Sequence, residues 1–325
     1  MNKLKKVSLT ALGTALVSSA SFAADMSVTG SAGLTFGGGD NANTGNGWSM
    51  SDTITIAGSA DLDNGWTVST SMSLDNDSTA ADIDAASTTI NMGDMGSLTF
   101  AGEDGSGPIA AWDDVMPTAN EEAHHGVAGT PTGPTQGASG NQNFTYTNSS
   151  AIDGVALTVF YQPSGNAANI KSSVEYGIQY TGIDGLDVGF AMGENEDGVA
   201  PTNINTAIAA GGTYDNTVMY AKYTMDAFTF GYQTNSVDGS TANSDYDFTG
   251  IGLSYAVTED ISVSYNTTEV DYEEAGRGDQ EATGLSASWT NGSVTVSAST
   301  HDVKNVQGTN TVDNKAYEIN FGFAF

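Results

Sequence analysis

Apolar side chains recur at every second position along almost the whole chain after residue 24. The last stretch shows the pattern clearly, because its apolar positions share one parity: Tyr317, Ile319, Phe321, Phe323 and Phe325. The positions between them are small or polar, and the same holds in the other runs. We call these positions the polar parity, and we expect no aromatic side chain on it outside the loops. Because side chains two residues apart lie on one face of a strand, each run predicts a strand with one apolar and one polar face.

About sixteen such runs follow one another. Each is close to the roughly 9–11 residues that a tilted strand needs to cross a bilayer. A soluble β-sandwich shows the same alternation, with its apolar faces turned toward a core, so the strands alone do not separate the two classes.

The connections between the runs separate the two classes, because short and long connections alternate. The short ones are rich in Gly, Asp and Asn, as hairpin turns require: 61–65, 93–96, 149–154, 182–185, 225–227, 257–260 and 290–292. The long ones are 37–48, 76–86, 103–141, 163–170, 194–212, 237–245, 270–280 and 301–313. This sorting is typical of an outer-membrane barrel. We therefore predict an all-β fold, a transmembrane antiparallel β-barrel of about sixteen strands with both termini on the short-turn, periplasmic side.

The segment 103–141 is far longer than an ordinary connection, and such segments are usually functional or disordered. It follows the fifth run and is rich in carboxylates, Gly and Pro, with one large aromatic residue, Trp112. We interpret it as the constriction of a water-filled pore, folded inside the barrel. The alternative is a mobile surface loop. Its candidate constriction residues are Glu103, Asp104, Asp113, Asp114, Glu121, Glu122, His124 and His125.

The first residues have the features of a secretory signal peptide. Three lysines precede a short apolar stretch, and Ser21-Phe22-Ala23 places small residues before an expected cleavage after Ala23. We expect residues 1–23 to be removed and residues 24–325 to form a single barrel. Cleavage would take the net charge from −31 to −34 and leave five of the eight basic residues. The absence of Cys fits an exported protein that is stabilised by strand pairing.

Three stretches together resemble the general bacterial diffusion porins, in particular those of alphaproteobacteria. They are Ala24-Asp25-Met26-Ser27-Val28-Thr29-Gly30-Ser31-Ala32-Gly33-Leu34 at the expected mature start, Gly96-Ser97-Leu98-Thr99-Phe100-Ala101-Gly102-Glu103-Asp104 before the long segment, and the terminal run 317–325. The resemblance implies a trimeric sixteen-stranded barrel in the outer membrane of a Gram-negative bacterium, whose third extracellular loop folds into the lumen. It also implies that the final aromatic run, ending on Phe325, is the signal that the barrel-insertion machinery reads.

In that family an acidic loop faces a cluster of basic wall residues across the constriction. The acidic side carries over to the six carboxylates of the segment 103–141 named above. The basic side does not, because the mature chain holds only Lys171, Lys222, Arg277, Lys304 and Lys315, with no Arg cluster on any run. The family's transverse field is therefore not expected in this protein.

Four charged residues are expected on the polar face of the wall: Glu175, Asp187, Lys222 and Glu318. Lys222 belongs there because a lysine on the lipid face at mid-depth costs about 2–4 kcal/mol. Since carboxylates lining a pore favour cations, we predict a cation-preferring channel for passive diffusion of small hydrophilic solutes and ions. The alternative is that the acidity serves solubility alone. The negative charge argues against binding of nucleic acid.

Other chemistry finds little support in the sequence. Two acidic loops hold weak Ca²⁺ candidates, Asp75 and Asp77 in one and Asp271, Glu273 and Glu274 in the other, but neither follows the spaced calcium-loop pattern, which favours a solvated acidic rim and no cofactor. His124 and His125 lack zinc-motif spacing, and as neighbours in a strand they would point in opposite directions, so we expect no zinc site. No nucleophile elbow accompanies a histidine, which argues against an enzyme.

Two other kinds of barrel remain as alternatives to a diffusion channel. One is a solute-specific porin for nutrient uptake, and the other is a structural or adhesin barrel with a plugged lumen. Single-channel conductance would distinguish them, being large and unsaturable, saturable, or absent.

Overall fold

The computed structural model describes residues 25–40, 47–75, 82–125, 137–164, 171–195, 213–239 and 245–325. Its barrel strands are β1 (Asp25–Gly39), β2 (Trp48–Asp61), β3 (Thr67–Asp75), β4 (Asp82–Asn91), β5 (Ser97–Glu103), β8 (Asn143–Ile152), β9 (Val155–Gln162), β10 (Ser173–Tyr180), β11 (Leu186–Asn195), β12 (Tyr214–Met225), β13 (Phe228–Gly239), β14 (Tyr246–Ala256), β15 (Ile261–Tyr272), β16 (Gln280–Asn291), β17 (Val294–Lys304) and β18 (Asn314–Ala324). The shorter elements are η1 (Gly93–Met95), β6 (Gly105–Ser106), α2 (Pro108–Trp112), β7 (Ser139–Gly140) and η2 (Val306–Gly308). The expected cleavage site after Ala23 lies outside the described residues.

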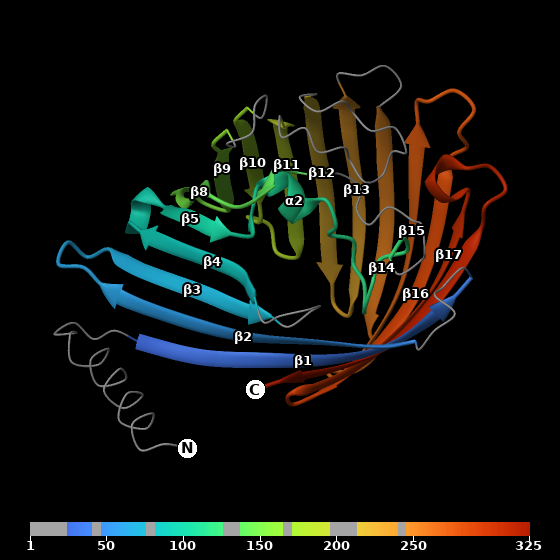
Figure 1. The fold of residues 1–325 in the computed structure, drawn as a ribbon, viewed down its shortest axis with the longest axis horizontal. Coiled ribbons are helices and arrows are strands. Elements are labelled where there is room, and N and C mark those ends of the chain that lie inside the picture. Colours follow the sequence, from blue (N-terminus) through green and yellow to red (C-terminus); the bar gives the residue numbers. More distant parts are fainter. Residues whose placement is uncertain are drawn as a thin grey trace.

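The sixteen long strands form one closed antiparallel barrel, as the sequence predicts (Figure 1). Each strand pairs with its neighbours in chain order, except that β5 pairs with β8 across the 103–141 segment. The first strand, β1, pairs with both β2 and β18 and so closes the sheet. At this seam Gly30 N donates to Phe325 O at 2.7 Å, and Phe325 N donates to Gly30 O at 2.9 Å. Closure pairs the strand edges, which a sheet surrounded by lipid requires.

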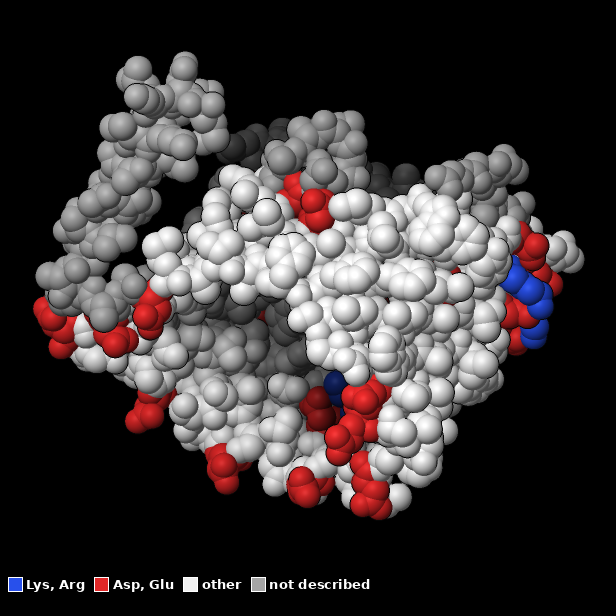
Figure 2. Space-filling model, turned by 90° about the horizontal axis from the view of Figure 1, so that it is seen from below, with Lys and Arg blue, Asp and Glu red and all other residues white. Residues whose placement is uncertain are grey.

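The outer face of the wall is apolar and exposed. The alternating residues of one parity include Val28 at 66% exposed, Ile251 at 56% and Phe230 at 47%. Residues of the other parity are largely buried in β10–β17, but in β1–β4 they are partly or fully exposed. Figure 2 shows one side of this surface, where a broad band without charged side chains separates acidic residues near its margins. Exposing apolar surface to water costs about 25 cal/mol of free energy per Å². This outer face is therefore suited to contact with the hydrocarbon of a bilayer.

The inner face is less polar than the sequence pattern predicts. The expectation that its parity holds no aromatic residue outside the loops is wrong, because the described strands bury five aromatic side chains of that parity outside the predicted connections: Phe160, Tyr214, Tyr220, Tyr246 and Phe248. Tyr272, which falls within the predicted connection 270–280, is buried on the same parity. Four of these six side chains pack with Val237 and Val270 into one cluster across β12–β15. These rings are at most 6% exposed, so they do not form an open aromatic track, and two of them contact the 103–141 segment: Tyr220 meets Trp112 and Phe248 meets His124.

Several strands extend further than the apolar pattern indicates. The predicted long connections began at 270 and 301, but β15 continues to Tyr272 and β17 to Lys304. Likewise β4 begins at Asp82, inside the predicted connection 76–86. Strand pairing continues in these hairpins after the apolar outer residues have ended, with pairs such as Asp247 with Asp271 and Asp302 with Lys315. Among the described residues, no helix is both long and apolar enough to span a membrane.

Candidate functional site

The 103–141 segment leaves the wall at the end of β5. Asp104 has a φ of +49°, a left-handed conformation that Asp tolerates better than most residues, and it turns the chain away from the strand. Gly105–Ser106 then pairs with Ser139–Gly140 to form a narrow neck. Asn143 fastens this neck, because its amide donates to Gly105 O at 3.1 Å and to Gly140 O at 2.7 Å. Both ends of the segment are thereby held together beside β8.

Beyond the neck, Glu175 on β10 holds two parts of the segment at once. Its Oε2 accepts a hydrogen bond from Ile109 N at 3.0 Å, and its Oε1 accepts one from Ala138 N. The side chain is fully buried, so both carboxylate oxygens depend on these partners. Ile109, in α2, packs against Ala191 and Val218 of the wall, where α2 lies inside the curve of the strands (Figure 1).

The middle of the segment is held by two amides on β13. Gln233 Oε1 accepts from Val115 N at 3.1 Å, while its Nε2 donates to Asp113 O. Asn235 Nδ2 also donates to Asp113 O, at 3.2 Å. Both side chains are buried, and both satisfy main-chain groups that no helix or sheet ladder pairs.

Asn120 fastens the far end of the segment to three strands. Its side chain and main chain together contact the inner faces of β16, β17 and β18 through Ser286 at 3.2 Å, Ser297 at 2.7 Å, Ser299 at 3.2 Å, Glu318 at 2.9 Å and Asn320 at 3.3 Å. The preceding residue, Ala119, donates its N–H to Ser264 Oγ of β15 at 2.8 Å. The segment thus follows the inner wall from β10 to β18.

Glycines on the inner face make room for this close approach. A Cβ at Gly252 of β14 would lie 2.8 Å from Pro117 Cδ, and a Cβ at Gly284 of β16 would lie 2.8 Å from Ala123 Cα. Such distances are too short for carbon atoms, so a side chain at either position would displace the segment. The absence of a Cβ is therefore part of what places the segment.

The histidines of the segment lie among its carboxylates. His125 Nδ1 is 2.8 Å from Glu121 Oε2, and His125 Nε2 is 3.2 Å from Asp114 Oδ2. His124 Nδ1 is 4.0 Å from Glu122 Oε2, and the two imidazole centroids are 4.8 Å apart. The expectation that the two rings point in opposite directions is wrong, because this stretch forms a turn and not a strand.

The proximity of these groups shifts their pKa values. Hydrogen bonds to Asp114 and then Glu121 raise the pKa of His125 to about 10. Burial, and then the neighbouring carboxylate of Asp114, raise the pKa of Glu122 to about 10. Burial alone would raise the pKa of Asp114, but His125, Glu122 and His124 together lower it to about 2. The segment therefore neutralises part of its own negative charge with His125 and with a proton on Glu122.

The expected wall residues all contact partners on the inner face. Glu175 and Glu318 anchor the segment, as described above. Lys222 Nζ lies 3.2 Å from Asp187 Oδ2, and Tyr220 donates its hydroxyl to Asp187 Oδ1 at 3.0 Å. Lys222 is thus paired, while its neighbour Tyr223 is 45% exposed on the outer face.

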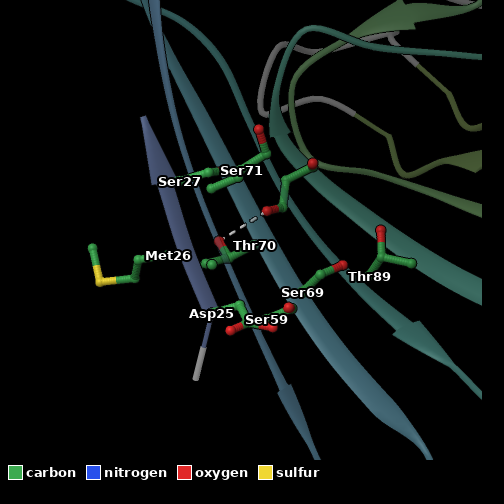
Figure 3. A pocket seen from close by; sticks show the side chains of 11 residues that line it. Asp25, Met26, Ser27, Ser59, Ser69, Thr70, Ser71 and Thr89 are labelled. Atoms are coloured by element: carbon green, nitrogen blue, oxygen red, sulfur yellow. Dashed lines mark hydrogen bonds between the residues drawn. The ribbon is translucent and has the colours of Figure 1, made fainter. Parts of the chain in front are cut away.

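The wall across β1–β4 carries hydroxyl groups in place of basic residues. A hollow of about 310 Å³ lies over these strands, and Figure 3 shows the side chains that line it: Asp25, Met26, Ser27, Ala57, Gly58, Ser59, Ser69, Thr70, Ser71, Ser87 and Thr89. At its edge Thr70 Oγ1 donates to Ser87 O at 3.0 Å. Residues 25–170 contain no Lys or Arg, so β1–β5, β8 and β9 offer no basic counterpart to the acidic segment.

The Ca²⁺ candidates are not brought together as a ligand set within the described part of the chain. Glu274 forms an ion pair with Arg277. The pKa of Glu273 is raised by a hydrogen bond to Asp245 and, to a smaller extent, by the negative charge of Asp245. Asp75 lies opposite Asp82 in the β3–β4 pair but belongs to no group of three or more potential ligands in the described ranges, and Asp77 lies outside them. The one group of three or more potential ligands in these ranges is Asp114, His124 and His125.

Sequence reasoning missed the polar residues that anchor the segment, namely Asn120, Gln233, Asn235, Ser264 and Ser286. The available signal was the polar parity itself, since Gln233, Asn235, Ser264 and Ser286 lie on that parity near the middle of their strands. The pattern shows that such residues face inward, but it does not show which of them meet the segment.

A sequence model of the Gram-negative porins matches residues 8–284. The chain belongs to this family. It is therefore an outer-membrane barrel that forms a channel for passive diffusion, and the family consists of channels, not enzymes. No curated protein sequence matches the chain.

Solved porin structures share the fold at low sequence identity. A loop-deletion variant of OmpT from Vibrio cholerae superposes with a TM-score of 0.73 at 13% identity and covers 93% of this chain and 100% of its own. OmpF of Salmonella typhi gives 0.70 at 13% identity, with 92% and 97% covered. An anion-selective porin from Comamonas acidovorans gives 0.68 at 11% identity, with 93% and 100% covered. At such identities the likeness concerns the fold, and ion selectivity has to be argued from this porin's own residues.

Proposed function

We propose that this porin is a cation-preferring channel for small hydrophilic solutes, narrowed by the 103–141 segment lying in its lumen. The observation that carries the proposal is the one-sided charge of the interior. Acidic residues of the segment stand on the inner face, while residues 25–170 contribute no Lys or Arg to the wall. A permeating cation would meet carboxylates and hydroxyls there, and an anion would meet no basic partner on that wall.

The basic residues elsewhere do little to offset this asymmetry. Basic side chains lie within ion-pair distance of carboxylates in Lys222 with Asp187, Arg277 with Glu274, Lys304 with Glu281 and Lys315 with Asp302. Paired charges largely cancel at a distance, so the remaining acidic excess determines the field at the pore mouths. His125 and the proton on Glu122 reduce the negative charge of the segment, so we expect the preference for cations to be moderate.

Single-channel recordings in planar bilayers test the channel itself. For a general diffusion pore we expect a conductance that rises linearly with salt concentration. Added sugars should not block the current, because the pore has no binding site that they could fill. A saturating conductance would instead indicate a solute-specific porin, and the absence of conductance from folded protein would indicate a plugged barrel.

The assembly and export of the protein are further parts of the proposal. Residues 1–23 act as a cleaved signal peptide, and the exposed Phe325 at the seam is read by the barrel-insertion machinery. A trimer form of the structurally similar Vibrio cholerae OmpT supports a homotrimer for this chain, embedded in outer-membrane lipid. Chemical crosslinking in detergent followed by electrophoresis should show three linked chains, and a ladder that stops at one or two would contradict the trimer.

A further inference from the structure

The cluster of Asp114, His124 and His125 has the composition and spacing of a metal site. Each side chain offers one ligand atom, and the three atoms lie within 4.8 Å of one another. In a tetrahedral zinc site with bonds of 2.0–2.2 Å, the ligand atoms are roughly 3.3 Å apart. The separation of 3.2 Å between His125 Nε2 and Asp114 Oδ2 already matches this value. The third ligand atom has to approach by no more than about 1.5 Å to reach the same spacing.

We propose that Asp114, His124 and His125 bind a divalent first-row transition-metal ion such as Zn²⁺. Imidazole nitrogen suits Zn²⁺, Cu²⁺ and Ni²⁺, whereas Ca²⁺ and Mg²⁺ prefer oxygen ligands alone. The cluster thus differs in chemistry from the acidic loops considered from the sequence.

A carboxylate next to the cluster orients one of its ligands. Glu121 Oε2 lies 2.8 Å from His125 Nδ1, so this nitrogen keeps its hydrogen, and a metal ion would take the place of the proton that lies between His125 Nε2 and Asp114 Oδ2. Metal-binding histidines usually donate their second N–H to such a partner, which fixes the tautomer and increases the basicity of the ligand. His125 therefore has both the ligand atom and the supporting carboxylate that a metal site requires.

Glu122 supplies a further oxygen at the cluster. This residue is only 4% exposed, and its Oε1 accepts a hydrogen bond from Met116 N at 2.5 Å. Its Oε2 is buried, makes no hydrogen bond of normal geometry and lies 4.0 Å from His124 Nδ1. A buried carboxylate oxygen in this position is costly unless a proton or a cation satisfies it.

The surroundings hold the cluster in place and leave it open on one side. The ring of His124 packs edge-on against Phe248 of β14, with 5.9 Å between centroids. Asp114 and His125 are about one third exposed, at 35% and 31%, which gives a metal ion a path from the lumen. The proposed metal site requires the folded segment but not a cation-preferring channel, so metal binding and ion selectivity can be tested separately.

Isothermal titration of the detergent-solubilised protein with ZnCl₂, and separately with MgCl₂, tests the proposal. We expect one Zn²⁺ per chain and no comparable Mg²⁺ binding. His125→Gln and Asp114→Asn should each abolish or weaken Zn²⁺ binding more than tenfold, and Glu121→Gln should weaken it by about 10–100-fold. Asp226→Asn is the matched control, because it removes one negative charge from the exposed turn between β12 and β13 and should leave Zn²⁺ binding unchanged.

Two further measurements make the result decisive. Heat-modifiable migration on gels verifies that each variant still forms a folded barrel. Co²⁺ in place of Zn²⁺ should give the visible absorption of a low-symmetry, four-coordinate site in the wild-type protein but not in His125→Gln. Zn²⁺ binding that is equal in His125→Gln, Asp114→Asn and Asp226→Asn would overturn the proposal, as would equal binding of Mg²⁺ and Zn²⁺ by the wild-type protein.

Discussion

Single side chains on the inner wall determine where the 103–141 segment lies. Glu175 accepts main-chain hydrogen bonds from both of its halves, and Gly252 and Gly284 leave the space that its main chain occupies. The two kinds of residue act differently, since one supplies hydrogen bonds and the other supplies room. Each can be tested by a single substitution.

Glu175→Ala should release the segment near α2. Each hydrogen bond to a charged acceptor contributes about 1.5–3 kcal/mol, and two are lost. We expect a higher single-channel conductance with more current noise, together with a lower unfolding midpoint in urea. Glu194→Ala, an exposed residue on the neighbouring strand β11, is the control and should change neither quantity. Unchanged conductance in Glu175→Ala would show that this carboxylate does not hold the segment.

Gly252→Ala should displace the segment by steric contact, because the new Cβ would lie 2.8 Å from Pro117. Gly322→Ala on β18 is matched to it, since its Cβ would meet its nearest atom, in Thr295, at 3.9 Å, which is an ordinary contact. We expect altered conductance in the first variant and wild-type conductance in the second. Equal conductance of Gly252→Ala and the wild-type protein would contradict the close packing of the segment on β14.

The sequence identified the acidic residues of the segment but not their partners. Glu175, Asp187, Lys222 and Glu318 were expected on the inner face from parity alone, and all four contact partners there. Their partners could not be predicted, because a period of two gives the face of a residue and not its neighbour across the lumen. The contact between the rings of His124 and His125 was not predicted, because strand geometry was assumed for a stretch that forms a turn.

The strands themselves were largely predictable at the scale of elements. Alternation predicted about sixteen strands, and the tight turns predicted the hairpins, because lipid on one side imposes a strict apolar parity. The strand ends were less predictable. In β15 and β17, strand pairing continues beyond the last apolar residue on the outer face, so the apolar pattern does not show where the strand ends. The inner aromatic cluster across β12–β15 was missed because the polar parity was assumed to face water, whereas these rings pack against one another and Phe248 also packs against His124 of the segment.

Asn120 tests the attachment of the segment to β16–β18. In the wild-type protein, Asn120 Nδ2 donates to Glu318 Oε1 at 2.9 Å. Asn120→Asp keeps the shape of the side chain, but it removes the amide N–H donors and places a second carboxylate beside that of Glu318. We expect this end of the segment to detach, with larger and noisier conductance. In the double variant Asn120→Asp with Glu318→Gln, an amide again faces a carboxylate, and conductance should return toward the wild-type value. Failure of the second substitution to restore it would exclude this pair as the anchor.

At the scale of the whole molecule, the charge is distributed unevenly between the two sides of the interior. The acidic segment follows the wall from β10 to β18, and β1–β4 present a hydroxyl-lined hollow without Lys or Arg. The barrel and the membrane location follow from the family and the fold, whereas ion selectivity depends on this arrangement of charges. Salt screens such fields within about 8–10 Å, so the preference for cations should weaken as ionic strength rises.

The zero-current potential of the purified protein in a planar bilayer, measured across a KCl gradient, tests the central claim most directly. We predict a potential of the sign that K⁺ permeation produces. We also predict that it moves toward zero when Glu103, Asp104 and Asp113 are changed together to their amides. A potential of the opposite sign, or one that is unchanged in the triple variant, would contradict the account.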